Sequence, residues 1–211
     1  LDLCTEKNFM KRYWEKFYKK NYSLKIIKQS SPFSKFVLKK IIDYYTIIDL
    51  GCGNGRDSVF FHSKGKNVIG IDQSIQAINQ NNNKFKQTKL KFLDLDLSKD
   101  FGKKIKIKGP KCFYSRFFIH SLKPELIDKH FYHLSKIFKK NDLLFLEYRC
   151  FEDKYKKKIF DNHYRNFMKT TDIEKILNKY KLYSSLIEKG VSFAKFRNED
   201  PFVARHMVKK I

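Results

Sequence analysis

A β-branched run followed by three alternating glycines constrains the fold of this chain more than any other feature. The run is Thr46-Ile-Ile-Asp-Leu50, and Gly51, Gly53 and Gly55 follow it. Such a run predicts a buried strand, and glycine tolerates both left-handed backbone and the close approach of another group. The sequence therefore predicts a strand that ends in a tight turn, with a small adenosine-like ligand lying against that turn.

Strand and helix patterns alternate along the rest of the chain. Strands are expected at 46–50, 67–71, 89–93, 111–115 and 142–148, and helices at 6–21, 56–64 and 74–85 and after Ser31, Pro124 and Thr171. The last two strands, near 182–188 and 202–209, lack a helix-length connection and should pair antiparallel. These elements predict an α/β fold, a Rossmann-like doubly wound seven-stranded sheet with a C-terminal antiparallel hairpin.

Three interpretations of the glycine turn compete. A dinucleotide site needs a further glycine at position 56, where this chain has Arg56. A phosphate-binding P-loop needs Gly-Lys-Ser/Thr, which does not occur in the sequence. The third interpretation is a structural turn without a ligand, which three glycines directly after Asp49 disfavour.

Acids at the ends of the next two strands support a ligand site. Asp72 ends the second predicted strand, about twenty residues after the glycines, where an acid can accept hydrogen bonds from both ribose hydroxyls. Asp94 and Asp96 follow the third strand, where an acid can accept from an adenine amino group while Leu97 lies against the ring. We prefer Asp96 to Asp94 because of its distance from Phe92.

From Ile47 to Ser98 the chain resembles the class I S-adenosylmethionine-dependent methyltransferases, through Asp-Leu-Gly-Cys-Gly-Asn-Gly, Gly-Ile-Asp and Leu-Asp-Leu-Ser in that order. The resemblance implies S-adenosylmethionine as cofactor and S-adenosylhomocysteine as product. It places Asp49 and the three glycines around the methionine part, Asp72 at the ribose and Asp96 at the adenine. The other predicted cofactor contacts are Tyr13, Tyr18, Arg56, Gln73, Leu97 and Tyr114. The length of 211 residues and the lack of an interdomain linker predict one domain, with residues 1–44 as an N-terminal helical cap and 45–211 as the catalytic core.

The formal charge of +24 suggests a nucleic-acid partner at first sight. The basic residues are spread along the whole chain, however, and lysine, asparagine, isoleucine, phenylalanine and tyrosine are all heavily used. This usage is typical of an AT-rich genome. We therefore interpret the charge as a solvated surface and expect no nucleic-acid partner.

The few arginines are more informative than the many lysines. Only seven of the 46 Lys and Arg residues are arginines, and the arginine fork suits phosphate, phosphoramidate or carboxylate groups. The predicted substrate contacts on the ligand side of the sheet are Arg116, Arg149, Tyr164, Arg165, Arg197 and Arg205. The plainer alternative for Arg149 is a pair with a neighbouring acid.

Tyr114, His120 and His163 are the predicted catalytic residues. A phosphate-type oxygen is already anionic and needs little base catalysis, whereas a sugar hydroxyl would have to lose a proton to His120 or His163. A structural histidine near the start of a helix is the alternative for His120. Neither Asn/Asp-Pro-Pro-Tyr/Phe nor Pro-Cys follows the fourth predicted strand. The chain therefore departs from the DNA methyltransferases that modify amino groups and from those that modify carbon 5 of cytosine.

Tyr114–His120, Phe145–Arg149, His163–Arg165 and Glu199–Arg205 resemble methyltransferases encoded in bacterial capsule loci, some of which are linked to O-methyl phosphoramidate. The resemblance implies O-methylation of a phosphoramidate or phosphate on a small anionic glycan precursor. A sugar hydroxyl or another small molecule is the first alternative, and RNA is the second. No metal set like that of catechol methyltransferases occurs.

The compartment is inferred from cysteines and hydropathy. Cys4, Cys52, Cys112 and Cys150 lack metal-ligand spacing, and small buried thiols are typical of a reducing compartment. No apolar run reaches membrane-spanning length and the N-terminus lacks a signal-peptide pattern. We expect a cytoplasmic protein with neither a metal site nor membrane insertion.

Overall fold

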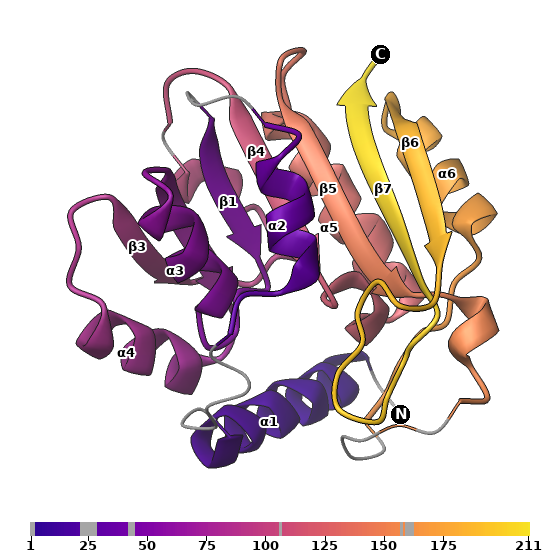
Figure 1. Cartoon of the computed structure of the whole chain (residues 1–211), viewed down its shortest axis with the longest axis horizontal. Coiled ribbons are helices and arrows are strands. Elements are labelled where there is room, and N and C mark those ends of the chain that lie inside the picture. Colours follow the sequence, from indigo (N-terminus) through magenta and orange to yellow (C-terminus); the bar gives the residue numbers. More distant parts are fainter. Residues whose placement is uncertain (1–2, 22–28, 42–44, 106, 157, 159–162) are drawn as a thin grey trace.

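A single sheet of seven strands forms the centre of the molecule (Figure 1). The computed structural model describes residues 3–21, 29–41, 45–105, 107–156, 158 and 163–211, with side chains from residue 10 onward. The strands are β1 (Thr46–Leu50), β2 (Asn67–Asp72), β3 (Leu90–Asp94), β4 (Lys111–Arg116), β5 (Leu143–Arg149), β6 (Leu182–Gly190) and β7 (Val203–Lys210). Their order is β3-β2-β1-β4-β5-β7-β6.

The pairing of these strands confirms the predicted fold. Strands β1 to β5 run parallel to one another. Strand β7 is antiparallel to both of its neighbours, β5 and β6. The strand order reverses between β1 and β4, and in open α/β sheets ligands bind beyond the carboxyl ends of the strands at such a switch point.

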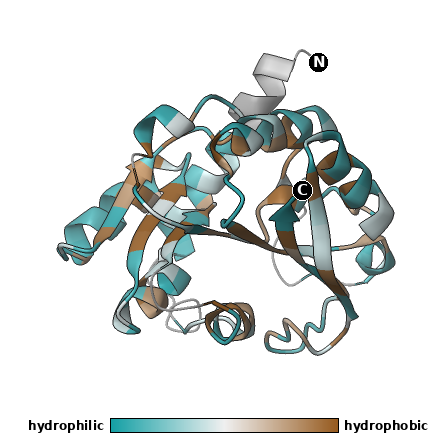
Figure 2. Cartoon of the chain, turned by 90° about the horizontal axis from the view of Figure 1, so that it is seen from above, coloured by the Kyte–Doolittle hydropathy of each residue, from teal (hydrophilic) through white to brown (hydrophobic). Residues whose placement is uncertain are grey.

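Helices cover both faces of the sheet (Figure 2). They are α1 (Leu3–Asn21), α2 (Pro32–Leu38), α3 (Arg56–Ser63), α4 (Ile75–Lys84), α5 (Pro124–Ile137) and α6 (Thr170–Lys179). One buried cluster contains Phe33 and Phe61 from α2 and α3, and the other contains Phe131 and Leu177 from α5 and α6. The consecutive residues Ile47 and Ile48 of β1 join opposite clusters, because successive strand side chains point to opposite faces of the sheet.

Local signals explain where two of the helices begin. The Ser31 hydroxyl accepts from the Ser34 amide and Pro32 opens α2, which confirms the predicted helix start. Thr171-Asp-Ile-Glu174 has the sequence pattern of a capping box, which predicts that the helix is capped by Thr171, but this prediction is wrong. Helix α6 begins at Thr170, and the Asp172 carboxylate reaches back to the Lys169 amide at 3.1 Å.

Helix α1 lies across the carboxyl ends of the strands, at the bottom of Figure 1. Its Glu15 carboxylate accepts from the Ile75 and Gln76 amides and from the Ser74 hydroxyl, at 2.8, 3.0 and 3.2 Å. These groups are the N-terminus of α4, where unsatisfied amides and the helix dipole favour an anion. Glu15 therefore attaches α1 to the edge of the ligand end of the sheet.

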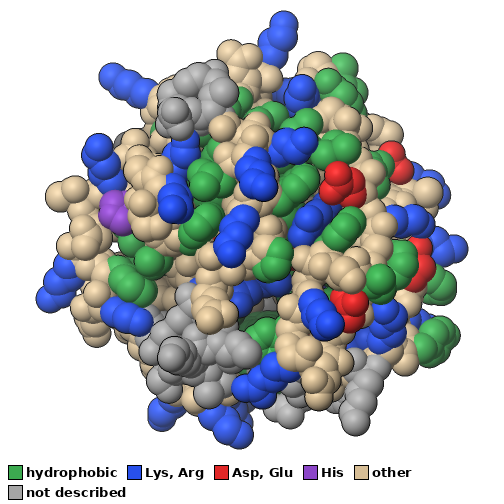
Figure 3. Space-filling view, in the orientation of Figure 1, with side chains coloured by type: hydrophobic (Ala, Val, Ile, Leu, Met, Phe, Trp, Pro, Cys, Tyr) green, Lys and Arg blue, Asp and Glu red, His purple; other side chains and the backbone are tan. Residues whose placement is uncertain are grey.

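The surface agrees with a dispersed distribution of charge. Figure 3 shows Lys and Arg side chains over the whole visible face, with apolar side chains between them and few acids. Among the residues that the structure describes, no helix is both long and apolar enough to cross a bilayer. Cys52, Cys112 and Cys150 are buried free thiols.

Candidate cofactor and acceptor site

A cavity of about 620 Å³ opens at the carboxyl ends of the parallel strands, walled by α1 and by the loop between β6 and β7. Nine of the predicted cofactor residues line it: Tyr18, Asp49, Gly51, Arg56, Asp72, Gln73, Asp96, Leu97 and Tyr114. Six of the predicted acceptor-side residues line it too: Arg116, His120, Arg149, His163, Arg165 and Arg197. The topology thus brings together residues that are up to 179 positions apart in the sequence.

The glycine turn shapes one wall of this cavity. Gly51 has φ +78°, and a Cβ there would come within 2.7 Å of the Phe118 ring. Gly53 and Gly55 also have positive φ but lie behind the lining: a Cβ on Gly53 would collide with the Tyr18 hydroxyl. The absence of side chains at these two positions lets Tyr18, Asn81 and Phe92 pack against the turn, and contact of Gly53 and Gly55 with the cofactor stays a prediction.

Two buried acids beside the turn carry strongly raised pKa values. Burial raises the pKa of Asp49 to about 8, although the Ser58 hydroxyl donates to its carboxylate at 2.6 Å. Burial also raises the pKa of Asp72 to about 6, against hydrogen bonds from the Ser74 and Gly53 amides. A cation placed between these carboxylates would relieve the cost of their burial.

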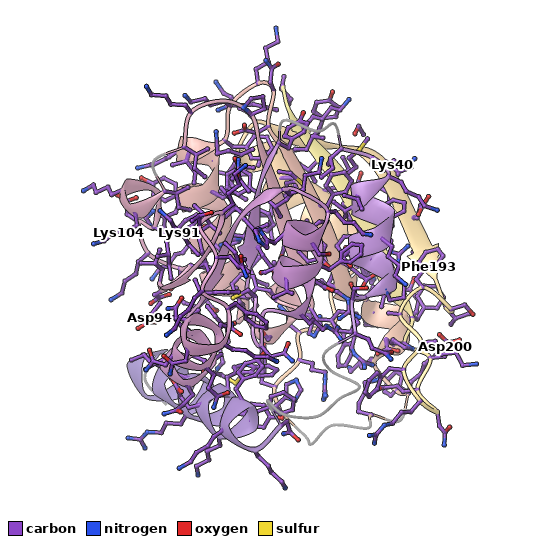
Figure 4. The ribbon with its side chains drawn as sticks, turned by 60° about the vertical axis from the view of Figure 1, so that its left-hand side comes forward. Lys40, Lys91, Asp94, Lys104, Phe193 and Asp200 are labelled. Carbon is purple, nitrogen blue, oxygen red and sulfur yellow. The ribbon has the colours of Figure 1, made fainter. Side chains whose placement is uncertain are left out.

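The third predicted acid also faces the cavity. Asp96 accepts from the Ser98 amide and hydroxyl at 3.0 and 2.6 Å, so its carboxylate is oriented by the loop after β3. Asp94 is exposed and does not line the cavity, and Figure 4 shows it at the outer edge near α4. This placement agrees with the preference for Asp96 as the adenine contact, which stays a prediction.

A buried polar cluster that the sequence did not predict connects cavity residues predicted for the cofactor with cavity residues predicted for the acceptor. Asp57 accepts from the Ser31 amide and hydroxyl at 2.7 and 2.8 Å and from the Tyr114 phenol at 2.7 Å. Burial opposes ionisation of Asp57, but Arg56, Arg116 and these donors lower its pKa overall. The phenol proton of Tyr114 is thereby committed to Asp57. Asp57 lies two residues after the glycine turn, and its contact with Ser31 had no sequence signal.

Arg116 is held by an acid while its fork remains available. Its Nε donates to Glu147 Oε1 at 2.8 Å, and no hydrogen bond from its two Nη groups reaches another residue that the structure describes. The guanidinium lies 4.2 Å from the centroid of the Phe117 ring. Phe117 has φ +54°, a strained value for an aromatic residue, and such strain persists where the surroundings hold it.

Arg149 is neutralised by two acids, as the alternative interpretation expected. It donates to Asp153 at 2.7 Å and to Glu199 at 2.6 Å, and all three side chains are nearly buried. Glu199 comes from the loop between β6 and β7, and nothing in the sequence pointed to it as the partner of Arg149. Arg149 therefore ties this loop to the end of β5.

Arg205, a predicted substrate contact, does not line the cavity, and its contact with the substrate stays a prediction. Its guanidinium is nearly buried, pairs with Glu147 at 2.8 Å and lies over the ring of Phe193. Tyr164 also lies outside the lining, beside Lys123, and so does Tyr13, whose ring meets that of the lining residue Trp14 edge-on. Aromatic and basic residues in segments near the site suggested contact with a ligand, but only some of these side chains line the cavity.

The two histidines lie in different surroundings. His120 is buried, and its Nδ1 accepts from the Arg149 amide at 3.2 Å, which assigns the proton of the neutral ring to Nε2. Burial, followed by Arg149 and His163, holds the pKa of His120 well below its usual value. His163 packs against the Tyr13 and Trp14 rings, with centroids 4.9 and 5.0 Å away. It thereby joins its segment to α1.

Comparison with known proteins identifies the central part of the chain. Residues 47–141 match a family model described as a methyltransferase domain. No curated protein matches the chain. A solved S-adenosylmethionine-dependent methyltransferase from Anabaena variabilis is 16% identical, with a TM-score of 0.75 and 95% of each chain covered.

Two further solved structures have the same fold at similar distance. A methyltransferase from Clostridium acetobutylicum is 16% identical, with a TM-score of 0.65 and coverage of 94% of this chain and 98% of that chain. Magnesium protoporphyrin IX methyltransferase from Synechocystis, solved with bound cofactor, is 16% identical, with a TM-score of 0.58 and coverage of 83% and 76%. These neighbours confirm the predicted fold, and the domain match confirms the predicted enzyme class.

Proposed function

We propose that this S-adenosylmethionine-dependent methyltransferase acts on an anionic oxygen, that of a phosphoramidate or phosphate on a precursor of a bacterial surface polysaccharide. The observation that carries the proposal is the division of charge within one cavity. Asp49, Asp72 and Asp96 line the cavity from the segment 49–98, together with Arg56 and Asp57. Arg116, Arg149, Arg165 and Arg197 line it from later segments, with Glu199 paired to Arg149. The resemblance of these arginine-containing segments to enzymes of capsule loci supports the polysaccharide precursor.

The acidic part fits the cofactor. Asp49 and Asp72 have raised pKa values, so both gain when the ammonium or sulfonium of the cofactor lies beside them. Asp72 would bind the ribose, and Asp96 with Leu97 the adenine. When bound, the cofactor supplies an electrophilic methyl group and accepts the electron pair of the carbon–sulfur bond.

The basic part fits an acceptor that already carries its negative charge. Arg116 can hold an anionic oxygen with its Nη groups while Glu147 holds its Nε. Methyl transfer is an in-line displacement, so this positioning is the main task of the protein. With Nδ1 occupied by a backbone amide, His120 has its proton on Nε2 and is poorly suited to deprotonate a hydroxyl.

A methyl-transfer assay with labelled cofactor tests the proposal. Glycerol phosphate, glycerol phosphoramidate, free glycerol, a nucleotide-linked sugar and RNA should be compared side by side. We expect transfer to the phosphate or phosphoramidate oxygen to exceed transfer to free glycerol at least about 100-fold, since charged hydrogen bonds each contribute about 1.5–3 kcal/mol.

Matched variants separate the acceptor contact from general damage. Arg116→Lys should lower transfer strongly and leave cofactor affinity intact, while Arg12→Lys, at an exposed position outside the cavity, should change neither. Preference for a hydroxyl acceptor or for RNA would contradict the proposal. In the hydroxyl case, His163 would be the base to test next, because it also lines the cavity.

A further inference from the structure

Arg116, Glu147 and Arg205 form a row across three adjacent strands. In the sheet, Arg116 of β4 pairs in register with Glu147 of β5, and Glu147 pairs with Arg205 of β7. Glu147 accepts from Arg116 through Oε1 and from Arg205 through Oε2, both at 2.8 Å. Both oxygens of this carboxylate thus accept hydrogen bonds from guanidinium groups.

This row is almost completely removed from solvent. The side chains of Glu147, Arg205 and Arg116 are 0%, 8% and 12% exposed. Two cations and one anion leave an excess positive charge in a buried place, which is costly unless a further anion arrives. Arg149 presents the opposite case, since two acids flank it.

The excess charge is directed to the cavity at one end only. Arg205 is enclosed by the Phe33, Phe36 and Phe193 rings and donates to the Phe193 carbonyl at 3.0 Å. Arg116 lines the cavity, and only its Nε is used by Glu147. Burial lowers the pKa of Arg116, but Glu147 and the neighbouring Tyr114 and Asp57 raise it overall, so the group stays cationic.

We propose that Glu147 and Arg205 are positioning residues that hold the Arg116 guanidinium for an oxyanion of the acceptor. Arg205 fixes the second oxygen of Glu147, so that the first oxygen can orient Arg116 without neutralising it fully. The inference rests on the proposed function, because it assigns which cation meets the anionic acceptor and what supports that cation.

Calorimetric titration with inorganic phosphate at constant ionic strength, on protein saturated with S-adenosylhomocysteine, tests this arrangement. Glu147→Asp keeps the charge but shortens the side chain by one methylene, so it cannot span both guanidiniums. Arg205→Met removes the outer anchor and leaves a simple pair. Both should weaken phosphate binding about tenfold, the loss expected for one charged hydrogen bond, with unchanged affinity for S-adenosylhomocysteine.

Controls distinguish positioning from a structural role. Arg116→Met should abolish phosphate binding, Arg12→Met should preserve it, and Arg205→Lys should restore part of what Arg205→Met loses. A purely structural role would lower the urea midpoint of Glu147→Asp and Arg205→Met without changing phosphate affinity in the folded protein, and that result overturns the inference. In that case, if only Arg116→Met lost phosphate binding, the proposal of an anionic acceptor would still hold. If the unaltered protein binds no phosphate, both the inference and the proposed acceptor fail.

Discussion

The two parts of the cavity are built in opposite ways. The acidic part comes from one stretch of chain, residues 49–98, in which each acid stands at or just beyond a strand end and binds groups close in sequence. The basic part collects side chains from β4, β5 and loops near residues 165 and 197, and far partners hold them. A site formed by one contiguous segment can be identified from its sequence. A site whose side chains come from several strands and loops can be identified only when the order and register of the strands are known.

The electrostatics of the two parts also differ. Asp49 and Asp72 have pKa values raised by burial, so they are poised to respond to an arriving cation. Arg116 and Arg149 already have acidic partners, and only the balance of charge distinguishes them. The acidic part therefore changes its protonation on binding, while the basic part depends on prior orientation.

The largest expected effect is at the glycine turn, where Gly51→Ala should weaken cofactor binding about 100-fold, or about 2.7 kcal/mol. A Cβ there would crowd Phe118 and force the turn to shift. Gly65→Ala is the matched control, because Gly65 has φ +79° but nothing within 4 Å of the added carbon. Gly65→Ala should lose about 1 kcal/mol of stability in urea unfolding from left-handed strain, and Gly51→Ala should lose more because of the added contact with Phe118. Equal cofactor affinity in the two would remove the turn from the site.

The second prediction concerns pH. A cationic cofactor selects the ionised form of Asp49, whose pKa is about 8 in the free protein, so protonation competes with binding below that pH. Affinity should rise about tenfold between roughly pH 6.5 and 7.5, with release of a proton. Calorimetry across this range checks it. Asp49→Asn should flatten the dependence, and an unchanged slope would assign it to another group.

A tenfold effect should separate the two acids after β3. Asp96→Asn should weaken cofactor binding about tenfold, because an amide replaces one acceptor of a charged hydrogen bond. Asp94→Asn should leave affinity unchanged, since Asp94 lies outside the cavity at the edge seen in Figure 4. The reverse pattern in a cofactor titration would transfer the adenine contact to Asp94.

The smallest effect should occur at the rim of the basic part. Arg197 is exposed, and exposed charge pairs contribute about 0–1 kcal/mol. Arg197→Met should therefore weaken phosphate binding no more than about threefold, and added salt should reduce the difference. If Arg197→Met matched Arg116→Met, the anion would sit at the rim and not at the buried row.

The sequence predicted the acidic part because its information is local. Thr46–Leu50, the glycines and Asp72 each occupy positions that strand periodicity and backbone freedom determine within a few residues. The roles of the arginines could not be predicted in the same way. Whether Arg116 meets Glu147, and Glu147 meets Arg205, depends on register across three strands, and a slip of one residue would turn these side chains to the other face.

Partners in distant segments account for the other differences. Asp57 directly follows the glycine turn and Arg56, but its function in the cluster depends on Ser31, 26 residues earlier. Arg149 was correctly suspected of pairing with an acid, yet Glu199, 50 residues later, could not be named from the sequence. Tyr13 and Tyr164 lie on segments that border the cavity, but neither side chain lines it, so their contacts stay predictions.

The contact of Glu15 with the start of α4 links two events that are otherwise separate. The Ser74 whose hydroxyl donates to Glu15 also donates its amide to Asp72. The attachment of α1 and the predicted ribose contact of Asp72 therefore share the atoms of Ser74. By thermodynamic reciprocity, any partner that lifts α1 weakens cofactor binding by the factor with which the cofactor holds α1 in place.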